Sequence, residues 1–97
     1  MEQSELLAVI DQAGEDGSPE LNLANQGIDR LPPEIGNLSH LSELNLIDNS
    51  LTTLPVEIGN LHNLIGLHLS HNRYLAALPR EVFNLTSLRE LSLPGHD

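Results

Sequence analysis

Three side chains of types that bind metal ions, Asp48, His68 and His71, stand near one another in this 97-residue sequence. Two imidazoles and a carboxylate form a ligand set that zinc or nickel accepts. Their spacing matches no metal-binding motif, and exposed histidines are common on ordinary polar surfaces. The chain also has no cysteine, which excludes thiolate metal sites and disulfides. We therefore predict no metal and no other cofactor.

Catalytic chemistry has equally weak support. Ser42, Ser70 and Ser92 have histidines or carboxylates nearby only because polar residues recur along the chain. The sequence contains neither a GxSxG turn nor the GxxxxGK[ST] loop that cradles nucleotide phosphates, and it has no lysine at all. We expect a protein that is not an enzyme.

The charge balance excludes further classes of partner. Fourteen acidic residues face four arginines, which gives a net charge of -10. Such a chain lacks the basic surface that binds nucleic acid or an anionic membrane. Glu2 and Glu5 replace the basic start of a signal peptide, and no stretch approaches the roughly 20 apolar residues of a membrane span. We predict a cytoplasmic protein with no nucleic-acid or membrane partner.

A repeat specifies the elements that position these side chains. Leucine accounts for 21 of the 97 residues, and shifting the sequence by 23 residues makes most leucines coincide. In the first such shift, Leu21, Leu23, Ile28, Leu31, Pro32, Ile35 and Gly36 fall on Leu44, Leu46, Leu51, Leu54, Pro55, Ile58 and Gly59. A period of this length predicts similar coils stacked on one another.

The unit from Leu41 to Asn63, LSELNLIDNSLTTLPVEIGNLHN, resembles the intracellular leucine-rich repeat pattern LxxLxLxxNxLxxLPxxIGxLxx. The resemblance covers about residues 18–97 and implies a short solenoid. Residues 4–35 are similar to the start of bacterial leucine-rich repeat proteins, among which the Roco type carries a GTPase domain further along the chain. We predict a capping helix and loop over residues 1–17, followed by repeats over 18–40, 41–63, 64–87 and, in part, 88–97.

The residues of one unit predict the same α/β architecture on physical grounds. Leu44 and Leu46 are two apart, so both point into the interior from a short strand. Asn49 and Asn72 stand at the following turns, where their amides can bond the backbone of neighbouring coils. Residues 56–60 predict a short helical or 3₁₀ return on the convex side. The strands would pair in parallel and line a concave face.

The first residues predict a helix that covers the first coil. Ser4 is its expected N-cap and Gly14 its C′ residue. Its apolar side chains share one face, formed by Leu6, Val9, Ile10 and Ala13. A solenoid needs such a cap because its first coil has no preceding neighbour.

The strand side chains that point away from the interior form columns on the predicted concave face. This surface is polar and acidic, and it suits a basic or hydrogen-bonding protein partner. The alternative is a solvated surface that binds nothing. The candidate partner-binding residues are Glu20, Asn22, Glu43, Asn45, Asp48, His68, His71 and Glu90.

The C-terminal coil departs from the others. Residues 1–72 carry a net charge of -10 and residues 73–97 of zero, and Phe83 stands where the repeat has Gly36 and Gly59. No helix caps this end, so its strand has an open edge that another copy or a following domain can cover. The candidate interface residues are Arg73, Tyr74, Phe83, Arg89, Leu91 and Leu93. Alternatively, Phe83 fills space inside the last coil and Tyr74 lies over its loop.

A non-catalytic protein-interaction or scaffold module is the primary functional hypothesis. A second hypothesis is the N-terminal recognition segment of a larger multidomain protein, such as a Roco-type GTPase. A third is a structural unit that assembles into a homo-oligomer through its C-terminal edge.

Overall fold

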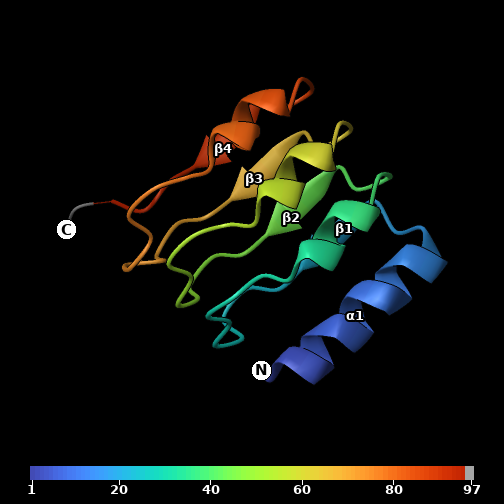
Figure 1. The fold of residues 1–97 in the computed structure, drawn as a ribbon, viewed down its shortest axis with the longest axis horizontal. Coiled ribbons are helices and arrows are strands. Elements are labelled where there is room, and N and C mark those ends of the chain that lie inside the picture. The colour runs from blue at the N-terminus through green and yellow to red at the C-terminus, as the bar shows by residue number, and fades with distance from the viewer. Residues whose placement is uncertain (96–97) are drawn as a thin grey trace.

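The computed structural model describes residues 1–95 and confirms the α/β solenoid (Figure 1). Each of the first three coils runs from a three-residue strand on the concave face to a 3₁₀ helix on the convex face, and a fourth strand follows. The strands are β1 (Glu20–Asn22), β2 (Glu43–Asn45), β3 (Gly66–His68) and β4 (Glu90–Ser92). The 3₁₀ helices are η1 (Pro33–Asn37), η2 (Val56–Asn60) and η3 (Arg80–Asn84), and one α-helix, α1 (Gln3–Asp16), precedes the coils.

The strands form a single parallel sheet in the order β1-β2-β3-β4. The register places the central leucines of the four strands in one row, Leu21, Leu44, Leu67 and Leu91. Leu44 and Leu67 are fully buried, because each lies between two neighbouring coils. The repeat period therefore sets both the strand register and the layers of the core.

Two glycines allow the convex side to pack closely. A Cβ atom at Gly36 would lie 2.8 Å from the carbonyl oxygen of Glu57, and a Cβ at Gly59 would lie 2.7 Å from that of Glu81. Real side chains do not tolerate such distances, so these positions let each 3₁₀ helix approach the next one. Phe83 occupies the equivalent position in η3.

Buried asparagines bond the coils to one another, as the sequence predicts. The side-chain amide of Asn49 donates to the carbonyl oxygens of Leu23 (2.9 Å) and Leu46 (3.0 Å). Its Oδ1 accepts from the backbone N–H groups of Gln26 (3.1 Å) and Ile28 (2.9 Å). Asn72 repeats three of these four bonds one coil later, with its Oδ1 accepting from the N–H of Leu51. Each asparagine thus satisfies turn groups that no strand or helix pairs.

Helix α1 covers the first coil at one end of the stack (Figure 1). Leu6, Ile10 and Ala13 are buried and Val9 packs against the core, so the predicted apolar face is confirmed. The predicted helix ends are wrong. The N-cap is Glu2 instead of Ser4, and its backbone N–H donates to the Glu5 carboxylate at 3.3 Å.

The C-terminal end of α1 also differs from the prediction. The helix continues past Gly14 to Asp16, and Gly17 ends it in the left-handed conformation with φ 63°. Gly14 lies inside the helix, and an added Cβ there would make an ordinary van der Waals contact with the Leu38 side chain, at 3.4 Å. The left-handed backbone therefore explains the glycine at position 17, whereas packing does not require the one at position 14.

Strand β4 forms the other edge of the sheet, with no neighbouring strand on its outer side within residues 1–95. Phe83 is 88% exposed, so the interpretation that it fills the interior of the last coil is wrong. Leu91 and Leu93 are 39% and 51% exposed, whereas the equivalent Leu67 and Leu69 are fully buried. His96 and Asp97, the last residues of the predicted partial repeat, lie outside the described residues.

Candidate functional site

The parallel register turns the outward strand residues into columns on the concave face, as predicted. Glu20 aligns with Glu43, Glu43 with Gly66, and Gly66 with Glu90. The neighbouring column contains Asn22, Asn45, His68 and Ser92. The glycine breaks the acidic column and leaves space on the surface of β3.

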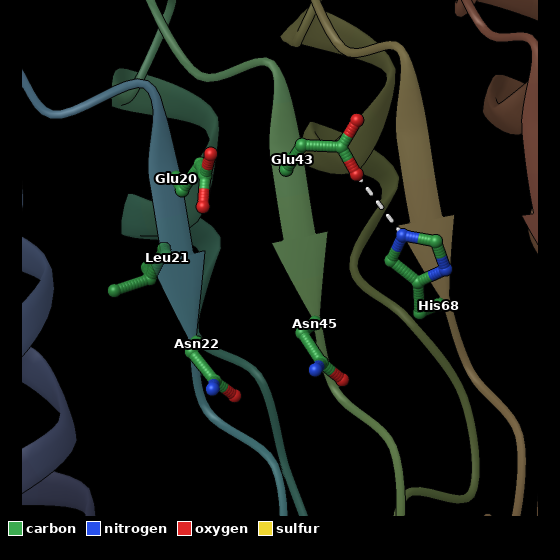
Figure 2. A pocket seen from close by; sticks show the side chains of 6 residues that line it. All are labelled: Glu20, Leu21, Asn22, Glu43, Asn45 and His68. Carbon is green, nitrogen blue, oxygen red and sulfur yellow. Dashed lines mark hydrogen bonds and ion pairs between the residues drawn. The ribbon is translucent and has the colours of Figure 1, made fainter.

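A polar hollow of about 400 Å³ lies on the first three strands (Figure 2). Its lining residues are Glu20, Leu21, Asn22, Glu43, Asn45 and His68. The structure therefore brings together five of the eight predicted concave residues. Leu21 is the repeat equivalent of Leu44, which is fully buried, but it points from β1 towards α1 and is only partly buried (Figure 2).

A hydrogen bond between Glu43 and His68 forms one wall of this hollow. The Glu43 Oε1 and His68 Nε2 atoms lie 3.0 Å apart. Because an ionised carboxylate can only accept hydrogen bonds, Nε2 carries the hydrogen of this bond. The carboxylate reaches His68 across Gly66, where an added Cβ would lie 2.8 Å from the Glu43 Cδ atom. The missing side chain at position 66 thus permits the pair.

Two asparagines form the lower part of the hollow in Figure 2. The Oδ1 atoms of Asn22 and Asn45 accept the backbone N–H groups of Ala24 and Ile47, each at 3.0 Å. These bonds fix the two side chains at the ends of their strands. The hollow therefore presents carboxylate acceptors on one side and oriented amide groups on the other.

Asp48 and His71 have a different role in the structure. Both occupy the turn that follows a strand, with φ 60° and 61°, and Asn25 has φ 55° at the equivalent turn of the first coil. Asn, Asp and His are the non-glycine residues that enter the left-handed region most readily. Within the described residues, no three His, Cys, Asp or Glu side chains are grouped so that they could hold a metal. Backbone geometry thus explains these residue types without a ligand.

Glu90 lies on β4, beyond the gap that Gly66 leaves, and does not line the hollow. The C-terminal candidates are spread over several elements. The guanidinium of Arg73 lies 5.6 Å from the ring centre of Tyr74 in the loop after β3, while Phe83 is on η3 and Arg89 directly precedes β4. A second hollow of about 330 Å³ at this end includes Leu93.

Sequence reasoning missed most of this second hollow. Its other lining residues are Leu75, Ala76, Ala77, Leu78 and Pro94. The adjacent alanines were a usable signal, because small apolar residues leave space beside larger ones.

Comparisons with known proteins agree with this architecture. The model of the leucine-rich repeat region matches residues 20–96. The chain belongs to the leucine-rich repeat family. Its fold is similar to the solved structure of a leucine-rich repeat protein from Leptospira interrogans, with 48% sequence identity and a TM-score of 0.75. No curated protein matches the chain.

The match to the Leptospira protein covers 77% of this chain and 19% of that one. Leucine-rich repeat domains are in general protein-interaction folds that bind protein partners. No helix within residues 1–95 has the length and apolar character that a membrane span requires.

Proposed function

We propose that this leucine-rich repeat chain is a non-catalytic protein-interaction module that binds a cationic side chain of a protein partner in the concave hollow. The observation that carries the proposal is the Glu43–His68 pair held over Gly66. It fixes a carboxylate at the centre of the concave face, where a guanidinium or ammonium group of a partner can reach it.

The charges around the hollow support this choice of partner. Two carboxylates line the hollow, those of Glu20 and Glu43, and Glu43 contacts His68 through one of its oxygens. A partly exposed pair of side chains such as Glu43 and His68 contributes only about 0–1 kcal/mol to stability, so the fold does not depend on this contact. The net charge of -10 also attracts cationic partners over a distance and accelerates their association.

Selection from a random displayed-peptide library tests the proposal directly. We expect the wild-type protein to enrich peptides that contain arginine or lysine, and the double variant Glu20→Gln, Glu43→Gln to lose this enrichment. Glu34→Gln, Glu57→Gln is the matched control, because it also removes two negative charges, from η1 and η2 on the convex side. Enrichment that is equal in the double variant and the control, or that shows no preference for basic residues, would contradict the proposal.

Two narrower functions stay proposals beside this one. Similarity of residues 4–35 to bacterial proteins supports a recognition segment of a larger protein, such as a Roco-type GTPase, and continuation of the reading frame into a GTPase domain would test it. Exposed apolar side chains on the last coil support self-association. A cytoplasmic location also stays a prediction.

A further inference from the structure

The C-terminal end of the solenoid exposes a set of apolar side chains whose equivalents elsewhere are buried or replaced by glycine. Phe83 and Leu93 are the most exposed of them. The nearby hollow extends this surface with leucine and alanine side chains. The opposite end has no such surface, because α1 covers it with Leu6 and Ile10.

We propose that this end binds the same end of a second copy, with β4 antiparallel to β4 of the partner subunit. The two four-stranded sheets then become one eight-stranded sheet around a two-fold axis. This inference rests on the self-association proposed above and adds its partner, geometry and register. It does not depend on the concave hollow.

The hydrogen bonds between coils identify the groups that β4 leaves free. The N–H groups of Leu23, Leu46 and Leu69 each donate to the following strand, so the equivalent donor at the open edge is the N–H of Leu93. The carbonyl oxygens of Pro19, Ser42 and Ile65 each accept from the following strand. The equivalent acceptor at the open edge is the carbonyl oxygen of Arg89.

These two groups select one register. Antiparallel strands exchange N–H···O=C bonds between residues that lie directly opposite. If Leu91 lies opposite Leu91 of the partner subunit, Arg89 of each chain lies opposite Leu93 of the other. The N–H of Leu93 in each chain then donates to the carbonyl oxygen of Arg89 in the other chain, so the two-fold axis produces two such hydrogen bonds.

This register also extends the hydrophobic core from one copy into the other. Leu91 occupies the same row as Leu44 and Leu67, whose side chains are fully buried in the interior. Residues that are directly opposite in an antiparallel pair point to the same face of the sheet. The two Leu91 side chains therefore meet on the interior side, and the row of leucines runs through both copies.

Phe83 favours a second copy over another coil of the same form. Gly36 and Gly59 accept the next 3₁₀ helix at distances that exclude even a Cβ atom. Phe83 occupies that position in η3, where its side chain would obstruct another coil at the same spacing. In the two-fold arrangement both η3 helices lie on one side of the joined sheet, where the exposed ring can pack against the partner.

The charge distribution also favours contact between the C-terminal ends of two copies. Residues 1–72 carry a net charge of -10, while residues 73–97 are neutral. Two copies that meet at their C-terminal coils therefore keep their acidic parts apart. A head-to-tail arrangement would instead place this apolar end against α1, whose outer face carries the exposed carboxylates of Asp11 and Glu15. The proposed assembly is a closed dimer.

Sedimentation equilibrium over a concentration series is the first experiment. We expect a monomer–dimer equilibrium for the wild-type protein and at least about tenfold weaker association for Phe83→Glu, since a charge then replaces an apolar contact. Val56→Glu is the matched control, because Val56 is an exposed apolar residue on η2, away from this end. Far-UV circular dichroism confirms that each variant is folded.

Single cysteines test the register, since the natural chain has none. Leu91→Cys should form a covalent dimer under mild oxidation, because opposite Cα atoms lie about 5.5 Å apart, within disulfide range. Leu93→Cys should not, because its two copies would be four residues apart along the strands, roughly 13 Å.

Each outcome is decisive. A folded wild-type monomer at all concentrations would overturn both self-association and the proposed register. A dimer that cross-links equally well, or better, through position 93 would overturn the register but leave self-association standing. A series of higher oligomers would overturn the closed two-fold arrangement. Selective cross-linking at position 91, with weaker association of Phe83→Glu, supports the inference.

Discussion

Replacing Asn72 by alanine should remove a large part of the stability of the fold. Its side-chain amide donates to the carbonyl oxygens of Leu46 (2.8 Å) and Leu69 (3.0 Å), and its Oδ1 accepts from the N–H of Leu51 (3.2 Å). The Leu46 carbonyl keeps its bond from Asn49. The other two groups lose their side-chain partner in a buried position, at a cost of about 1–3 kcal/mol each.

The expected loss is therefore about 2–6 kcal/mol, and we take about 3 kcal/mol as the central value. A chain of 97 residues has a total unfolding free energy of roughly 5–15 kcal/mol. With a urea m-value of about 1.5 kcal/mol/M, the midpoint should fall by about 2 M. Far-UV circular dichroism is the suitable signal, because the chain has no tryptophan and its one tyrosine is exposed.

The matched control is Asn45→Ala, which removes the same amide from a half-exposed strand position. There Oδ1 accepts one backbone N–H, that of Ile47 at 3.0 Å, and water can replace it. We expect a loss below about 1 kcal/mol. If the two alanine variants unfold at the same urea concentration, the bonds of Asn72 between coils do not stabilise the fold as described. A stabilising osmolyte added to all samples keeps a weak variant measurable.

Three further substitutions test other parts of the structure. Leu67→Ala should lower the unfolding free energy by about 2–5 kcal/mol, because the side chain is fully buried, and a loss below 1 kcal/mol in urea titration would be inconsistent with the leucine row. Gly59→Ala should cost about 1–3 kcal/mol in the same assay, since its Cβ would lie 2.7 Å from a carbonyl oxygen of the next coil. Gly66→Ala should keep the stability within about 1 kcal/mol but displace the Glu43 carboxylate, which is flexible. The His68 ring resonances in NMR spectra should shift in this last variant, and an unchanged spectrum would count against the Glu43–His68 pair.

The repeat made most of the fold predictable. One period fixes which leucines point inward, which residues pair across strands and where Asn49 and Asn72 bond the backbone. The ends of α1 were not predictable in the same way, because they occur once and have no repeated copy for comparison. Gly14 and Gly17 are both suitable C-terminal residues for a helix, and the residue types alone do not distinguish between them; in the structure the helix passes Gly14 and ends at Gly17.

The candidate site was predictable as a surface but not as a hollow. The register gives the columns, whereas the contact of Glu43 with His68 depends on how one side chain crosses Gly66. For Asp48 and His71, the sequence suggested a functional role where the structure shows a conformational one. Their residue types suggested ligands or partner contacts, but the turns also select residues that tolerate a positive φ.

The two ends of the solenoid differ in a way that affects its stability as well as its contacts. In a stack of coils each layer is stabilised by its neighbours, so an uncovered end loses about half of that contribution. Helix α1 supplies the missing neighbour at the first coil, whereas Leu91 and Leu93 at the last coil have none within residues 1–95. If a second copy covers the last coil, folding and association are coupled, and the melting temperature should rise with protein concentration. A melting temperature that is independent of concentration, in a protein that is otherwise folded, would mean that the last coil is stable without a partner.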